Sequence, residues 1–195
     1  MCVAAAVKSS PSFRRGTVGF TLIEMMVVIS IAALLLALAV PGFSALMASS
    51  RMESRTQALL SSVQFARSEA IRSNANVYLC ALNSKTNLDV QGCQGKAKKG
   101  DTSWSEGVLL FADRPGGTTA RYNSGERRRH VIFTGEPTVS SALDQFMLTP
   151  EGRLPTGVNP SWVVRDTPSG QCASVTVLAN GRPQLCRGAD CAGCA

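Results

Sequence analysis

One apolar stretch near the N-terminus restricts the fold of this 195-residue chain more than any other feature of its sequence. The stretch runs from Phe20 to Val40, and as a helix it would extend about 31 Å, enough to cross the hydrocarbon core of a bilayer. Glu24 is its only strongly polar residue. A carboxylate in a membrane helix costs free energy unless it has a partner, and no basic residue follows Glu24 within two helical turns. The partner must therefore belong to another chain or be an amino terminus created by cleavage.

Basic residues precede the apolar stretch and set its direction. Lys8, Arg14 and Arg15 lie on its N-terminal side, and positive charges beside a membrane span stay in the cytoplasm. The C-terminal part of the chain is therefore expected on the other side of the membrane. The net charge of the whole chain is +7, and this mild excess does not by itself imply a nucleic-acid partner.

Two other kinds of N-terminal segment have a similar composition. A secretory signal peptide also combines a basic start with an apolar stretch, and the small residues of Ala37–Ala39 would serve as its cleavage site. Against this interpretation, the apolar stretch is long for a signal peptide and has an acid at its start. The second alternative is an uncleaved signal anchor.

The residues around the acid carry a resemblance to a known signal. Gly19–Glu24 reads Gly-Phe-Thr-Leu-Ile-Glu, follows a short basic leader and precedes an apolar helix. It resembles the class III signal of type IV pilins and type II secretion pseudopilins, whose leader is removed by prepilin peptidase. The resemblance implies a leader of residues 1–19, cleavage between Gly19 and Phe20, and N-methylation of Phe20. It also implies that the Phe20 amine of one subunit pairs with Glu24 of its neighbour, which offsets the burial of both charges.

The helix predicted from Phe20 continues beyond the apolar stretch to about Ser73. Pro41 lacks a backbone N–H and clashes with the carbonyl four residues earlier, so we expect a kink or local unwinding at Pro41–Gly42. Residues 20–41 then form the membrane and assembly helix, and residues 42–73 form an amphipathic helix that continues into the head. The face predicted to pack on a sheet comprises Met52, Thr56, Leu59, Val63, Ala66 and Ala70. The other side carries Arg51, Arg55, Glu69 and Arg72.

After Asn74 the sequence signals become those of short strands. Asn180–Gly181 is a strong signal for a two-residue hairpin turn, because both residues tolerate positive φ. Loops are expected at 88–103 and 114–128, which are rich in glycine and charged residues. The predicted strands are Val77–Leu82, Gly107–Ala112, His130–Thr134, Gln145–Thr149, Trp162–Arg165 and Ser174–Ala179.

Four segments make the resemblance more specific. They are Phe65–Ile71, Val77–Cys80, Trp104–Gly107 and Ala179–Arg182, and they resemble the GspH/FimT/FimU group of minor pilins and minor pseudopilins. This resemblance implies an α+β, pilin-like fold, in which a long N-terminal transmembrane helix packs on a small antiparallel, sandwich-like β head of residues 74–195. It implies a single pass through the bacterial inner membrane with a periplasmic head, and assembly with other pilins or pseudopilins. The implied function is that of a structural minor pilin that primes or caps a type IV pilus. A GspH-like pseudopilin of a type II secretion system is the alternative.

Seven cysteines agree with an exported head. Cys2 lies in the leader, and an even number of remaining cysteines in an exported domain favours disulfides. The six candidates are Cys80, Cys93, Cys172, Cys186, Cys191 and Cys194. Cys191 and Cys194 form a Cys-x-x-Cys, but the sequence has no second such pair and only one histidine, so a zinc site is disfavoured. The resemblance implies that Cys80 pairs with Cys93.

Two pairings stay open for Cys172. A two-residue turn at the Asn-Gly dipeptide would set Val175 opposite Cys186, and Cys172 opposite Ala189. Either a bulge then allows Cys172 to pair with Cys186, which is slightly preferred, or Cys172 pairs with Cys191.

The sequence offers no arrangement of residues typical of an enzyme. His130 is the only histidine and follows three arginines, which disfavour its protonation. No paired carboxylate or nucleophile lies near it in the sequence, so we interpret it as a strand residue rather than a base. The sequence also lacks a Gly-x-x-x-x-Gly-Lys phosphate loop. We therefore expect no catalytic residue, metal, cofactor or small-molecule substrate.

Three basic clusters raise double-stranded DNA as an alternative partner. They are Lys96, Lys98 and Lys99; Arg127, Arg128 and Arg129; and Arg182 with Arg187. Some FimT-like pilins bind DNA for natural transformation through a Gly-Arg-x-Arg motif near the C-terminus, and the matching stretch here is Gly181–Gln184. Gln184 stands in place of the second arginine, so Arg187 could substitute only if the strand presents it on the face of Arg182. Such binding would consist mainly of salt-sensitive phosphate contacts.

Overall fold

The structure is a computed structural model that describes residues 19–84, 90–94, 102–113, 120–123 and 125–194. The chain divides into two compact units, Met1–Gly42 and Phe43–Ala195. Most of the predicted leader and the three lysines Lys96, Lys98 and Lys99 lie outside the described residues.

The helix α1, Leu22–Ser73, is capped by its own sequence at both ends. At its start the Thr21 hydroxyl accepts a hydrogen bond from the backbone N–H of Glu24 at 3.2 Å. Thr21 and Glu24 therefore have the residue types and spacing of a capping box. At its end Asn74 adopts a left-handed conformation with φ 48°, and the N–H of Ala75 donates to the carbonyl of Ala70 at 3.3 Å. This is the Schellman pattern, which satisfies carbonyls of the last helical turn.

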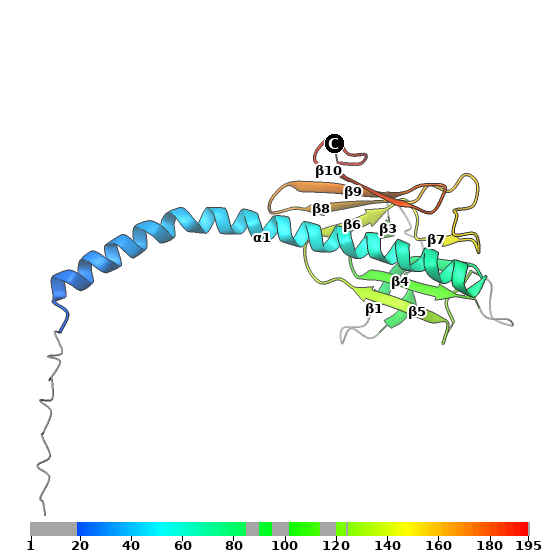
Figure 1. The fold of residues 1–195 in the computed structure, drawn as a ribbon, viewed down its shortest axis with the longest axis horizontal. Coiled ribbons are helices and arrows are strands. Elements are labelled where there is room, and N and C mark those ends of the chain that lie inside the picture. The colour runs from blue at the N-terminus through cyan, green and yellow to red at the C-terminus, as the bar shows by residue number, and fades with distance from the viewer. Residues whose placement is uncertain (1–18, 85–89, 95–101, 114–119, 124, 195) are drawn as a thin grey trace, which may run out of the picture. The chain divides into compact units, whose positions relative to one another are not determined.

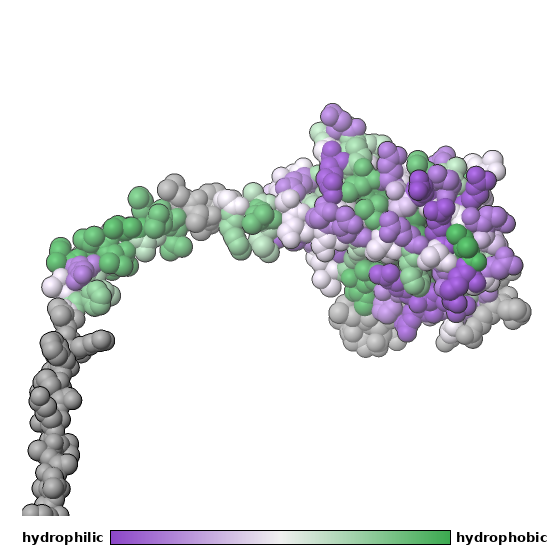
Figure 2. Space-filling view, viewed as in Figure 1, coloured by the Kyte–Doolittle hydropathy of each residue, from purple (hydrophilic) through white to green (hydrophobic). Residues whose placement is uncertain are grey.

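In the first unit, the apolar side chains of α1 have no cover from the rest of that unit. Every large hydrophobic residue from Phe20 to Leu36 is exposed, and Figure 2 shows an almost continuous hydrophobic surface along this part of the helix. Among the described residues, no single helix is long and apolar enough to span a membrane, although Leu22–Ala37 and Gly42–Ser73 meet the criteria as a pair. The backbone is helical through Pro41 and Gly42, so the helix does not unwind there, and the kink at this site stays a prediction.

The described part of the second unit contains ten strands, all paired in antiparallel fashion in two sheets, and the sheets can be followed in Figure 1. In the first sheet β1 lies between β4 and β7, β5 follows β4, and β2 pairs with the C-terminal end of β1. The second sheet has the order β10-β9-β8-β6-β3. The strands are β1 Val77–Ser84, β2 Val90–Cys93, β3 Thr102–Ser103, β4 Gly107–Ala112, β5 Arg127–Ile132, β6 Thr138–Ser141, β7 Gln145–Leu148, β8 Ser161–Asp166, β9 Gln171–Val177 and β10 Pro183–Arg187. The predicted α+β class and the antiparallel head are confirmed.

The main core lies between the two sheets and one face of α1. All six helix residues predicted to face a sheet are buried, and the five apolar ones pack in one cluster with side chains of both sheets. Aromatic rings fill the centre: the rings of Trp104 and Trp162 lie 5.2 Å apart, and those of Phe146 and Trp162 lie 5.4 Å apart. Burying such large apolar side chains is the dominant favourable term in the stability of the head.

The first sheet also has a buried second face, with a smaller cluster formed by Tyr78, Cys80, Leu82, Leu109 and Phe111. Because β1 and β4 are buried on both faces, their sequences read as continuous apolar runs without alternation. These two strands were the clearest strand signals in the sequence.

Two charged residues predicted on the side of the helix away from its apolar face are nevertheless buried. Arg55 is 8% exposed, and its Nη2 donates to the carbonyls of Thr134 and Gly135 at 3.2 and 3.0 Å. Its guanidinium also lies 4.3 Å from the centroid of the Phe133 ring. Glu69 is 6% exposed and pairs with arginines. The helical pattern placed them outside the apolar face, where Arg55 finds its partners in the segment after β5 and Glu69 finds them in α1 and β5.

Candidate functional site

The predicted processing site precedes the first turn of α1. Gly19 and Phe20 are exposed and lie outside the helix, which Thr21 caps and Leu22 begins. A side chain built at Gly19 would meet no atom within 4 Å among the described residues. The fold of the chain therefore does not itself require glycine at this position. An accessible, non-helical Gly19–Phe20 bond is suited to recognition by a peptidase.

Glu24 occupies the third position of the same capped helix. Its carboxylate is exposed, and no ion pair involving it occurs within the described part of the chain. An acid in the first turn is stabilised by the helix dipole, so Glu24 has a local role in starting the helix. An experiment on Glu24 therefore has to separate its predicted pairing with the Phe20 amine of a neighbouring subunit from its local role at the start of the helix.

The disulfides agree in part with the expected pairings. Cys80 pairs with Cys93, with Cα atoms 5.6 Å apart, which confirms the pairing implied by the family resemblance. The prediction for Cys172 was wrong: it pairs with Cys194 and not with Cys186 or Cys191. Cys186 and Cys191 pair with each other across a short loop.

The turn between β9 and β10 explains this error. The N–H of Gly181 donates to the carbonyl of Leu178, and the N–H of Leu178 donates to the carbonyl of Arg182. The turn therefore holds three residues, with Gly181 left-handed at φ 74°, and not the two residues predicted. The additional residue shifts the pairing by one position, so that Ser174 and not Val175 lies opposite Cys186.

This register places the cysteines where the C-terminal segment can cover them. Cys172 and Cys186 lie on the outer face of the second sheet, away from the buried Ala173 and Val175. The segment Gly188–Cys194 folds back over that face, and the Arg165 guanidinium donates to the carbonyl of Gly193 at 3.0 Å. A side chain at Gly193 would come within 2.5 Å of a Val163 methyl group, so only glycine fits there. Two disulfides thus fasten the end of the chain to the sheet.

The structure does not gather the predicted DNA-binding arginines. Arg182 lies in the turn before β10, whereas Arg187 is the last residue of that strand and forms an ion pair with Glu53 of α1. Gln184, which stands in place of the missing arginine, lies three positions before Arg187 on β10, so their side chains point to opposite faces and Arg187 does not take the place of that arginine. Arg127, Arg128 and Arg129 belong to β5 of the other sheet.

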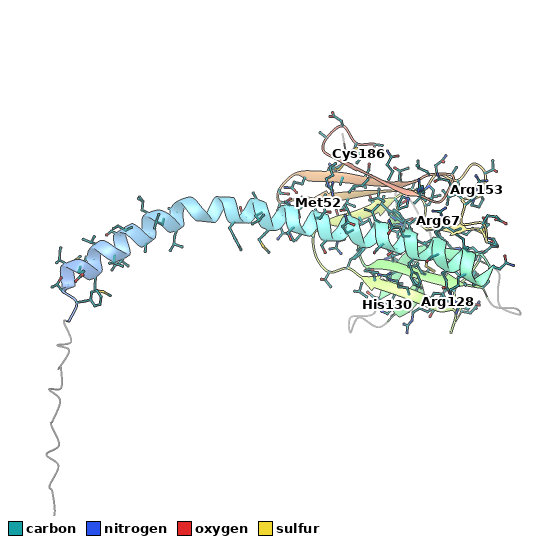
Figure 3. The ribbon with its side chains drawn as sticks, in the orientation of Figure 1. Met52, Arg67, Arg128, His130, Arg153 and Cys186 are labelled. Carbon is teal, nitrogen blue, oxygen red and sulfur yellow. A yellow bond between two sulfur atoms is a disulfide. The ribbon has the colours of Figure 1, made fainter. Side chains whose placement is uncertain are left out.

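Two of the three consecutive arginines make contacts within the head. Arg128 Nε lies 3.6 Å from a Glu69 oxygen, and the Arg129 guanidinium lies 5.3 Å from the centroid of the Phe65 ring. Figure 3 shows Arg128 and His130 together on β5, while Cys186 lies at the opposite side of the head. These arginines attach the edge of the first sheet to α1.

His130 lies within β5 and is partly buried. Burial lowers its pKa, and the positive charge of Arg127 lowers it further. A neutral histidine in a strand agrees with its interpretation as a structural residue. Within the described ranges, no group of three or more histidine, cysteine or acidic residues could hold a metal ion.

One surface feature was missed by the sequence analysis. A groove of about 690 Å³ runs between α1 and the start of β10, and we call it the α1/β10 groove. Its lining residues are Gln64, Arg67, Ser68, Ile71, Leu178, Arg182, Pro183 and Gln184. The sequence held one signal for it: Ile71 is a large aliphatic residue next to, and not on, the predicted apolar face of the helix.

Comparisons with known proteins found two matching family models and two similar crystal structures. The family model of the type II transport protein GspH matches residues 55–181, and that of the prokaryotic N-terminal methylation motif matches residues 19–40. Two crystal structures of the type IV minor pilin FimU from Pseudomonas aeruginosa are similar to this chain at 19% and 18% identity, each with a TM-score of 0.46. They cover 70% and 73% of this chain and 90% of their own chains. No curated protein matches the chain.

Proposed function

The chain belongs to the GspH family, and we propose that this pilin or pseudopilin is a structural minor pilin that primes or caps a type IV pilus. The family match covers the amphipathic half of α1 and most of the β head, and the methylation motif covers the apolar half of α1. Prepilin peptidase cleaves between Gly19 and Phe20 and the new amine is methylated. The processed subunit is stored in the inner membrane with its head in the periplasm.

The observation that carries this proposal is the apolar part of α1 with its single acid. The large hydrophobic side chains from Phe20 to Leu36 are exposed on a capped helix, and a helix that is apolar all round needs lipid or other helices around it. Glu24 has no basic partner among the described residues. In a filament, the Phe20 amine of the adjacent subunit supplies that partner.

The first experiment separates the pairing role of Glu24 from its local role at the start of the helix. Glu24→Gln keeps a residue type that suits the third position of a capping box but removes the charge. We expect Glu24→Gln and Glu24→Ala to be processed and membrane-bound but lost from sheared filaments. Thr21→Val is the matched control, because it removes the hydroxyl cap and keeps the acid. Normal incorporation of Glu24→Gln would exclude charge pairing as the driving interaction.

A second experiment tests the processing site. Gly19→Leu places a bulky side chain next to the scissile bond without disturbing any described neighbour. We expect the variant to accumulate as the heavier, unprocessed form. Amino-terminal sequencing of the wild-type protein from cells should begin at methylated Phe20. A different first residue would end the proposal.

A gene deletion and a copurification experiment distinguish a type IV pilus subunit from a subunit of a type II secretion pseudopilus. A type IV pilus role predicts that deletion of the gene reduces surface pili and that the protein copurifies with sheared pili. If deletion leaves pili intact but abolishes export of a protein through the outer membrane, the subunit is a GspH-like pseudopilin of a type II secretion system. DNA capture is not part of the proposal, because Arg128, Arg129 and Arg187 make contacts within the head and Arg182 is not in the same strand as Arg127–Arg129.

A further inference from the structure

We propose that the α1/β10 groove binds an acidic and apolar segment of a neighbouring filament subunit. This inference rests on the proposed function, because it assumes that the chain assembles with other pilins or pseudopilins. It goes further by assigning a docking surface to residues of the head, away from the helix half that carries Glu24.

The apolar component of the groove is unusual for this head. Apart from Phe43, Leu46 and Met47 near the start of the unit, Ile71 and Leu178 are the only large hydrophobic side chains that the described part of the second unit exposes. They are 53% and 41% exposed, and both line the same groove. Scattered apolar residues on a surface need no explanation, but two that meet in one concave site indicate a binding surface.

The groove also contains two arginines without an acidic partner in the described ranges. They are Arg67 of α1 and Arg182 of the turn before β10, and the Nε of Arg67 is buried without a hydrogen bond. By contrast, Arg72, Arg128 and Arg187 each form an ion pair within the head. A carboxylate entering the groove would supply the negatively charged partner that Arg67 and Arg182 lack among the described residues. The complementary partner is therefore acidic.

The walls of the groove are fixed by close packing. Gly181 lies against the backbone of Gly152, so that a side chain at Gly181 would come within 2.0 Å of the Gly152 carbonyl oxygen. Gly152 in turn packs on the side chains of Arg67 and Ile71. The turn before β10, the turn at Gly152 and the helix are thus held together. A preformed groove loses less conformational entropy on binding than one that must be ordered.

The start of β10 restricts how the partner can bind. Pro183 lies at the first position of this edge strand and has no backbone N–H to offer to an added strand. Recognition by strand addition at this position is therefore disfavoured. The partner is expected to bind by inserting an apolar side chain between Ile71 and Leu178 and placing a carboxylate near Arg67 and Arg182.

A protein segment fits these residues better than DNA does. DNA binding relies on several cations that follow the phosphates, whereas this groove has two arginines and two exposed aliphatic side chains. Gln184, where the related DNA-binding motif has its second arginine, lines the groove as a neutral residue. The surface is thus too apolar and too weakly charged for a phosphate backbone.

Site-specific photocrosslinking in cells tests the inference with the full-length protein. A benzoylphenylalanine at Gln184, which is exposed and lines the groove, reports the occupant. The matched position is Thr167, exposed in the turn at the other end of β9. We expect Gln184, but not Thr167, to crosslink a pilin or pseudopilin, and mass spectrometry to place the adduct within a few residues of an Asp or Glu beside an apolar residue.

Charge reversal in the groove gives the second readout. Arg182→Glu should reduce the yield of this crosslink about tenfold, which corresponds to about 1.4 kcal/mol of binding free energy, whereas Arg182→Lys should retain most of it. Leu178→Ser should reduce the yield without altering charge. An adduct on DNA or lipid, an adduct on a segment without acids, or a yield unaffected by Arg182→Glu would each overturn the proposal.

The two proposals fail in different ways. If the mature chain begins at Phe20 and Glu24→Gln blocks incorporation, the proposed function holds whatever the crosslinking shows. In that case a negative result at Gln184 excludes only the groove. If the chain is not processed at Gly19, the proposed function itself fails.

Discussion

Arg187 on β10 forms an ion pair with Glu53 on α1, although the two residues are 134 positions apart in the sequence. The Glu53 carboxylate also accepts a hydrogen bond from the Gln57 amide at 2.8 Å. These contacts lower the pKa of Glu53 from its ordinary value of 4.5, with Gln57 as the largest cause and Arg187 next. The pair joins the last strand to the helix that begins the head.

The first prediction follows from this pair. In Arg187→Gln and in Gln57→Ala the pKa of Glu53 should rise towards 4.5, as measured by carboxyl chemical shifts in an NMR titration. Because the pKa is lowered in the folded state, the stabilisation is present above the ordinary value and is lost as the pH falls through the folded value. Arg182→Gln is the control and should leave the pKa of Glu53 unchanged. An equal rise in the control would mean that general charge, and not this ion pair, sets the pKa.

The second prediction concerns Glu69, whose buried carboxylate accepts hydrogen bonds from Arg72 at 2.8 to 3.0 Å and lies 3.6 Å from Arg128. Glu69→Gln should lower the free energy of unfolding by about 1–3 kcal/mol, since a buried charge-assisted network is weakened. Arg72→Ala should cost less than about 1 kcal/mol, because the side chain of Arg72 is 72% exposed and Arg128 remains. Urea denaturation measures both. Equal costs would show that Arg72 alone holds the carboxylate.

The third prediction distinguishes the two C-terminal disulfides by the length of chain each closes. Cys172–Cys194 spans 22 positions and Cys186–Cys191 spans 5. In the chain-entropy description, removing the first as Cys172→Ala/Cys194→Ala should cost about 3 kcal/mol and removing the second about 2 kcal/mol. Urea denaturation of the processed protein in detergent measures both. A larger loss for the short loop would show that packing of the C-terminal segment, and not chain entropy, dominates.

The fourth prediction concerns the pH dependence contributed by His130. Its pKa is lowered from 6.5, first by burial and then by Arg127. The unfolded chain therefore binds a proton at higher pH than the folded one, and stability should fall as the pH drops from about 6.5 towards the folded pKa. His130→Gln should remove this part of the pH dependence. Arg127→Gln should raise the pKa of His130 only in part, because the burial of the ring remains. An NMR titration of the ring protons measures this pKa. A full return to 6.5 in the variant would show that burial has no effect.

The helix and several strands were predicted within one or two residues of their observed bounds, including β7 and β8. The helix to Ser73 and the strands at β1 and β4 were predicted closely, because a buried face imposes a helical period and full burial imposes an apolar run. The strands β2 and β3 lie in the segment predicted as a loop. Both are short, with four and two residues, so a local pattern does not reveal them, and the partner of β3 is also distant in the sequence.

The errors at the candidate site share a physical origin. The pairing of Cys172 was wrong because one additional residue in a turn shifts the register, and turn length is not fixed by an Asn-Gly dipeptide alone. The burial of Arg55 and Glu69 was not foreseen, because a helical pattern gives the side of the helix on which a side chain lies. It does not give the residues of other segments that contact the side chain there. The α1/β10 groove was missed for the same reason, since it forms only where a helix and a turn distant in the sequence meet.

The position of α1 within the head has a practical consequence for aggregation. Both β5 and β10 are edge strands, and α1 contacts each of them, through Arg128 with Glu69 on one side and Arg187 with Glu53 on the other. An uncovered strand edge invites pairing with another chain. Shortening the helix into this region would remove both contacts and should favour pairing of these edge strands with another chain. Any truncated form made for study should therefore retain the helix from before Arg51, because this amphipathic part of α1 contacts both edge strands through Glu53 and Glu69.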